Sequence, residues 1–78
     1  MEKEYRTDNF QLAAFLLSEG SCLISLDKTN LRRVQFIFKL TNGLKILIEN
    51  FLSYKAVCEP HKFFSAQKDL KQLIYSNN

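Results

Sequence analysis

The sequence predicts a small α+β domain in which amphipathic helices pack on one face of a short antiparallel sheet. Two observations lead to this fold class. Residues 32–40, RRVQFIFKL, alternate apolar and polar side chains almost perfectly, which is typical of a half-buried strand. Three other segments repeat their apolar residues at helical spacing. A chain of 78 residues has room for one core, so we expect a single domain over residues 1–78.

The first helix is expected over residues 8–19. Residues 1–6 are mostly polar and are predicted to be loose or to form a short edge strand, and we expect flexibility in 1–6 and 76–78. Thr7 and Asp8 are candidate caps, and Asp8 with Gln11 has the spacing of a capping box. Gly20 is expected to end the helix. Apolar residues occupy most of its circumference: Phe10, Leu12, Ala13, Ala14, Phe15, Leu16 and Leu17.

A β-hairpin is expected next, because strands 22–27 and 32–40 lie at hairpin distance. The polar connection lacks an Asn-Gly pair, so the loop should exceed two residues. In the second strand one face carries Val34, Phe36, Phe38 and Leu40, and the other carries Arg33, Gln35, Ile37 and Lys39. The first face should be buried beneath the helices and the second should be exposed.

Two more helices and a brief strand complete the prediction. Thr41 and Asn42 should cap a helix over 43–54, and residues 56–58 are expected to add a third strand. Pro60 suits the first turn of a last helix that ends at Tyr75. The predicted buried stripe of that helix is Phe63, Ala66, Leu70, Leu73 and Ile74. Its predicted outward residues are His61, Lys62, Ser65, Lys68 and Gln72.

Three segments resemble a family of small proteins in bacteria and their phages that is known only as a domain of unknown function. They are TDNFQLAAFLLSEG at 7–20, VQFIF at 34–38 and EPHKFFSAQKDLKQLIYS at 59–76. The family usually carries aspartate before the proline, where this chain has Glu59, a poorer N-cap. The resemblance implies a self-contained domain, often in phage or mobile-element settings. It implies no established activity and supplies no catalytic residue.

The residues give little basis for catalysis or for a cofactor. The acidic residues are scattered, and the two glycines cannot build a phosphate-binding loop. Cys22 and Cys58 are interpreted as small buried residues, with a disulfide as the alternative if their strands are neighbours. With His61 they supply at most three thiolate or imidazole ligands at unsuitable spacing. We therefore expect a non-enzymatic protein without cofactor or metal.

The chain also lacks the sequence features of a membrane protein. It begins MEKEYRTDN, without an apolar leader. Its longest apolar stretch, residues 12–17, is far shorter than the roughly 20 residues that a membrane span needs. We expect a cytoplasmic protein without membrane contact.

Nucleic-acid binding is the first functional hypothesis. Cations gather on and around the predicted hairpin, and Gln35 lies between two of them as a possible reader of base edges. The predicted DNA or RNA contacts are Lys28, Arg32, Arg33, Gln35 and Lys39. The alternative is that these charges only keep the surface soluble and protect a sheet edge. No aromatic residue is expected on that face, which argues against an RNA-recognition type of sheet.

Protein binding is the second hypothesis, because so small a chain has a surplus of apolar surface. The predicted partner surface consists of Phe15, Leu16, Leu23 and Ile37, and the partner would be a second copy of the chain or another protein. The alternative is that the last helix covers this surface within a monomer.

Overall fold

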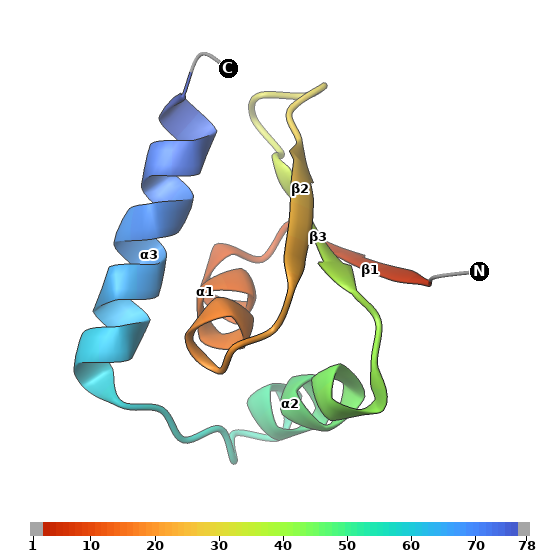
Figure 1. Cartoon of the computed structure of the whole chain (residues 1–78), viewed down its shortest axis with the longest axis vertical. Coiled ribbons are helices and arrows are strands. Elements are labelled where there is room, and N and C mark those ends of the chain that lie inside the picture. Colours follow the sequence, from red (N-terminus) through yellow and green to blue (C-terminus); the bar gives the residue numbers. More distant parts are fainter. Residues whose placement is uncertain (1–2, 77–78) are drawn as a thin grey trace.

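The protein is described by a computed structural model, which places residues 3–76 (Figure 1). The elements in chain order are β1 (Glu4–Thr7), α1 (Phe10–Ser18), β2 (Leu23–Asp27), β3 (Gln35–Lys39), α2 (Asn42–Leu52) and α3 (Pro60–Tyr75). The α+β class is confirmed, and of the two predictions for the N-terminal segment the edge strand is the observed one. The predicted flexibility of the two ends falls partly on residues 1, 2, 77 and 78, which lie outside the described residues.

The three strands form one antiparallel sheet in the order β1-β3-β2. Phe36 faces Thr7 on one side and Leu26 on the other, and Phe38 faces Tyr5 and Leu23 in the same way. The predicted hairpin is confirmed, and residues 28–34 form a connection longer than two residues. β3 begins only at Gln35, so the prediction that the strand starts at residue 32 is wrong, because Arg33 N–H closes a turn onto Asn30 O at 3.0 Å.

The prediction of a third strand at residues 56–58 is wrong. This segment connects α2 to α3 at the end of the molecule away from the hairpin loop (Figure 1), and Val57 is 82% exposed there. β1 occupies the free side of β3 instead, with Glu4–Thr7 in register with Lys39–Phe36. Residues 56–58 contain one β-branched side chain, Val57, and lie close to Pro60, so they were a weaker strand signal than the alternating segment at the N-terminus.

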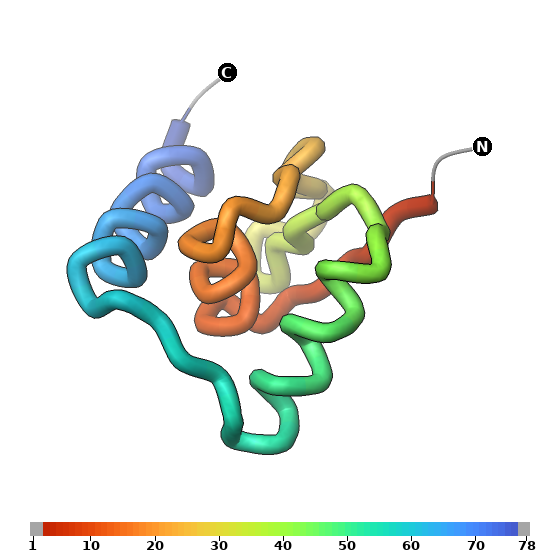
Figure 2. Tube along the Cα trace, turned by 60° about the horizontal axis from the view of Figure 1, so that its bottom comes forward, coloured from red at the N-terminus to blue at the C-terminus, as the bar shows by residue number. Residues whose placement is uncertain are grey.

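The helices cover one face of the sheet, as predicted. Figure 2 shows α1 between α3 and the strands. α2 also packs against α1. Phe36 and Phe38 of the sheet are buried against α1, whose residues 12–16 are all buried. Phe15 of α1 lies 5.9 Å from Phe51 of α2 between ring centroids. Leu44 of α2 and Ala66 and Leu70 of α3 complete the core.

Each helix begins at a side-chain cap. Asn9 caps α1, since its Oδ1 accepts from Leu12 N–H at 3.1 Å, so the predicted caps Thr7 and Asp8 are wrong by one or two residues. Thr41 caps α2 through Leu44 N–H at 3.0 Å, as predicted. Glu59 accepts from Lys62 N–H at 2.8 Å at the start of α3, and Pro60 is the first residue of that helix, as expected.

The two cysteines are unpaired and differ in exposure. Cys22 is exposed, so the prediction that it is buried is wrong. The reason is that β2 begins only at Leu23, which leaves Cys22 just outside the sheet. Cys58 is half-buried in the connection before α3 and contacts the core. Neither sulfur forms a disulfide.

Candidate nucleic-acid interface

The outer face of the sheet, opposite the helices, is not a cationic surface. The register places Glu4 opposite Lys39, Arg6 opposite Ile37 and Asp27 opposite Gln35. Arg6 Nη1 donates to Asp27 Oδ2 at 3.2 Å and to Gln35 Oε1 at 3.4 Å, so its side chain crosses the central strand. Two cations and two carboxylates therefore share this face, and Gln35, a predicted base reader, already has a partner.

Ile37 lies beneath this polar bridge and is only 5% exposed. The prediction that it forms part of an exposed partner surface is wrong. The alternating pattern places Ile37 correctly on the outer face, but it cannot show that Arg6 comes from a third strand and covers it.

Asp27 is held by the start of the hairpin loop as well as by Arg6. The Thr29 hydroxyl and backbone N–H donate to Asp27 Oδ1 at 2.6 and 3.0 Å. These hydrogen bonds, with a smaller contribution from Arg6, hold the pKa of Asp27 below its usual value, because they favour the ionised carboxylate. Asp27 is thus a stable counter-charge on the outer face of the sheet.

The hairpin loop, residues 28–34, carries the other predicted cations. Lys28 Nζ donates to Ser76 O at 3.0 Å and so joins the loop to the C-terminal end of α3. Arg33 Nε donates to Asp8 Oδ2 at 2.7 Å, while 74% of the Arg33 side chain remains exposed. The Arg32 side chain is also exposed. The prediction that Arg33 shares a sheet face with Gln35 and Lys39 is wrong, because Arg33 precedes the strand.

The predicted partner surface on the first helix is buried within the chain. Phe15 is 3% exposed and Leu16 is 0% exposed, so neither is available to a partner. α3 packs along α1, which is the alternative considered for this surface. Leu23 is half-buried and lines a hollow of about 600 Å³ with Ile24, Leu26 and Leu73, between β2 and α3.

Another surface lies on the side of α3 away from the core, where His61, Ser65, Lys68 and Gln72 were predicted to point outward. We call it the α3 outer face. All of its residues are exposed: His61, Phe64, Ser65, Lys68, Lys71, Gln72 and Tyr75. Phe64 is 62% exposed and Tyr75 is 79% exposed, although both are large and apolar. Phe64, Lys71 and Tyr75 were not predicted on this surface, although their helical spacing places them on the same side of α3.

The α3 outer face has no carboxylate. Asp69 is the only acidic residue within α3, and it lies about 140° around the helix from Phe64. It lines a hollow with Leu17 and Ser18 of α1 and with His61 and Ser65 of α3, so it lies at the α1 side of the α3 outer face, at its edge. His61 and Ser65 also line a second hollow of about 330 Å³, together with Phe64, Lys68 and Lys71.

The hairpin loop adjoins the C-terminal half of α3. Both lie at the same end of the molecule (Figure 1), where Lys28 contacts Ser76. Leu31, Arg32 and Arg33 line a hollow together with Asp8 and with Ile74, a core-facing residue of α3. The loop arginines therefore lie at the same end of the molecule as the last turn of α3.

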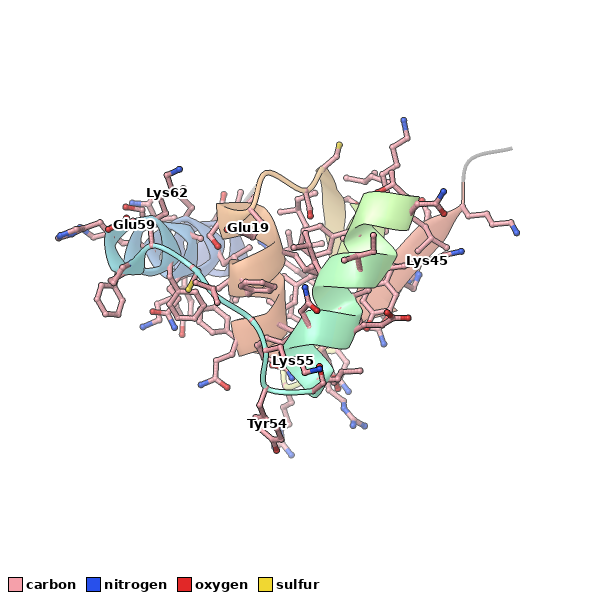
Figure 3. All side chains as sticks on the ribbon, turned by 90° about the horizontal axis from the view of Figure 1, so that it is seen from below. Glu19, Lys45, Tyr54, Lys55, Glu59 and Lys62 are labelled. Atoms are coloured by element: carbon pink, nitrogen blue, oxygen red, sulfur yellow. The ribbon has the colours of Figure 1, made fainter. Side chains whose placement is uncertain are left out.

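The opposite end of the molecule has mixed charge. Figure 3 shows Glu59 and Lys62 together at the start of α3, Glu19 at the end of α1, and Lys45 and Lys55 at the two ends of α2. Lys45 and Lys55 are both exposed. They provide a matched pair of lysines away from the α3 outer face.

The described residues contain neither a cluster of metal-binding side chains nor a membrane-spanning helix. Within residues 3–76, no three His, Cys, Asp or Glu side chains are grouped so that they could hold a metal ion. No polar or charged side chain in this part of the chain is buried. None of its helices combines the length and apolar character required to cross a membrane.

Comparison with known proteins identifies a family but no characterised relative. No curated protein and no solved structure matches the chain. The model of the family described as domain of unknown function DUF5659 matches residues 2–76, nearly the whole chain. The chain therefore belongs to the DUF5659 family.

Proposed function

We propose that this domain binds nucleic acid without catalysing a reaction, and that the α3 outer face and the two loop arginines form the contact surface. The observation that carries the proposal is the combination of Lys68 and Lys71 with the lack of any carboxylate on this face. A phosphate backbone is recognised mainly by such cations, whose binding releases counterions.

The loop arginines extend the surface beyond the helix. Arg32 and Arg33 are both exposed, and the loop that carries them is joined to the end of α3 by the Lys28–Ser76 hydrogen bond. The Asp8 carboxylate orients Arg33 and also offsets part of its charge, so Arg32 is the stronger phosphate contact of the two. Lys28 contributes by joining the loop to the end of α3.

The outer face of the sheet is a poorer candidate for the nucleic-acid contact than the α3 outer face. Arg6, Asp27 and Gln35 already satisfy one another on the outer face of the sheet. A phosphate there would have to compete with Asp27 for Arg6. On the α3 outer face the neighbouring carboxylate, Asp69, lies at the edge, about 100° around the helix from Lys68.

The test compares two pairs of lysines. Lys68→Gln with Lys71→Gln should weaken binding to a labelled oligonucleotide about tenfold at roughly 50 mM salt, because two phosphate contacts are lost. Lys45→Gln with Lys55→Gln makes the same charge change at the other end of the molecule and should change affinity less than about twofold. Equal effects of the two pairs, or no binding by the unsubstituted protein at low salt, would contradict the proposal.

A second candidate function is self-association through β2. The strand order leaves one edge of β2 without a partner strand, and this edge borders the hollow between β2 and α3. Ile24 and Leu73 line the hollow and are each 43% exposed. An unpaired edge next to apolar side chains is suited to pairing with another strand.

Sedimentation velocity over a concentration series tests this candidate. A dimer that Ile24→Lys dissociates would support it, because the new charge would lie at the pairing edge. A monomeric mass that persists at millimolar concentration would contradict it.

A further inference from the structure

Resting on the proposed nucleic-acid function, we infer that the ligand is single-stranded and that its bases stack on Phe64 and Tyr75. These are exposed aromatic side chains of α3, in a helix that buries Ala66 and Leu70 and packs Phe63 and Ile74 against the core. Phe64 is 62% exposed and Tyr75 is 79% exposed, so most of each ring is open to solvent. The rings provide two flat apolar surfaces at the place where the lysines lie.

The spacing along α3 suits an extended strand. Phe64 and Tyr75 are eleven residues apart in sequence, which corresponds to about 16 Å along a helix. Lys68 and Lys71 lie between them, and all four residues fall within about 60° of one another around the helix. A strand that follows α3 would therefore meet an aromatic ring at each end and cations between the rings.

The ring of Phe64 lies beside that of its sequence neighbour. The two ring centroids are 6.3 Å apart in a tilted arrangement. Phe63 is half-buried and packs against the core, and we infer that it helps to position the ring of Phe64. A ring that is already positioned loses less entropy when a base stacks on it.

A duplex would make poorer use of these side chains. Its bases are stacked on one another, so an aromatic ring reaches a base face only after a base step has opened. A single strand presents base faces without that cost, and aromatic side chains with interspersed cations are how proteins bind such strands without sequence preference. The aromatic residues would add nothing to duplex binding through phosphates alone.

Phe64→Ala and Tyr75→Ala provide the test, and both side chains are exposed, so the fold should tolerate their loss. Titrations use a fluorescent thymidine oligomer of about 20 nucleotides and a duplex of the same length. We expect the oligomer to bind more tightly than the duplex, and each substitution to weaken oligomer binding about tenfold while leaving duplex binding within about twofold.

Two controls make the result specific. Tyr75→Phe keeps the ring and should bind the oligomer like the unsubstituted protein. Tyr54→Ala removes a tyrosine that is 97% exposed and points away from the body of the molecule after α2 (Figure 3), and it should have no effect.

The possible results distinguish single-strand binding from nucleic-acid binding in general. Duplex binding as tight as oligomer binding, or alanine variants that bind the oligomer normally, would overturn the single-strand inference and leave nucleic-acid binding standing. No binding of either probe at low salt would overturn both. Unchanged thermal unfolding midpoints of the variants establish that a loss of binding is not a loss of folding.

Discussion

Two residues at helix ends have left-handed backbone angles, and they differ in what that conformation costs. Gly20 has φ +87° after α1, where Gly20 N–H bonds to Leu17 O and Ser21 N–H to Leu16 O. Tyr54 has φ +60° after α2, where Tyr54 N–H bonds to Phe51 O and Lys55 N–H to Asn50 O. Both are the C-terminal motif in which glycine is preferred. Only the first helix has glycine there.

Tyr54→Gly should therefore raise the free energy of unfolding by about 1 kcal/mol, because the strain of a left-handed tyrosine is removed and its exposed side chain loses no packing. Gly20→Ala at the equivalent position should lower it by about the same amount. Urea unfolding measures both values. A destabilised Tyr54→Gly would show that this tyrosine makes a contact that the structure does not explain.

Asp27 predicts a specific response to pH. Its pKa is lowered in the folded protein below 3.8, mainly by Thr29 and then by Arg6, so its contribution to stability is present above that pH and is lost as the pH falls through the lower folded value. The difference in unfolding free energy between the protein and Asp27→Asn should be largest near neutral pH. It should shrink as the pH falls below 3.8. A difference that stays constant down to about pH 2 would contradict this account.

At the scale of elements, the sequence predicted the helices better than it predicted their first residues. The periodic apolar stripes identified all three helices, and Thr41, Pro60 and Gly20 marked ends that the structure confirms. The start of α1 was ambiguous because Thr7, Asp8 and Asn9 are all good caps. The Asp8 carboxylate instead accepts a hydrogen bond from Arg33 of the hairpin loop, 25 residues away in sequence. Local sequence patterns carry no information about that contact.

The position of the cap can be tested by two single substitutions. Asn9→Ala should lower the free energy of unfolding by about 1 kcal/mol, because Leu12 N–H loses its acceptor. Asp8→Ala should cost less than about 0.5 kcal/mol, since its exposed ion pair with Arg33 is a weak interaction. If Asp8→Ala proved the more costly substitution, α1 would begin one residue earlier than described.

At the scale of the whole molecule, the sequence predicted how the core is built but not where charge accumulates. Phe36 and Phe38 were expected under the helices and are buried there. The predicted cationic sheet face failed because β1 was not foreseen as the partner of β3, and it brings Arg6 and Glu4 to that face. Which charges neutralise one another depends on strand order, and strand order is a property of the assembled fold.

The surface that remains is the α3 outer face. The helical period predicts that its residues are exposed. The charge of this face, however, depends on where the fold places the carboxylates of the chain. The Asp8 carboxylate pairs with Arg33, Asp27 accepts from the turn at Thr29, Glu59 caps α3, and Asp69 lies at the edge of the α3 outer face. The lysines Lys68 and Lys71 therefore share that face with no carboxylate among its own residues.

The most direct test of this account is the salt dependence of binding to a single-stranded oligonucleotide. The logarithm of the association constant should fall linearly with the logarithm of salt concentration, and Lys68→Gln with Lys71→Gln should reduce the magnitude of that slope by about 1.4, or about 0.7 for each phosphate contact. Lys45→Gln with Lys55→Gln should leave the slope unchanged. Identical slopes for the unsubstituted protein and both double variants would show that α3 does not contact the phosphates.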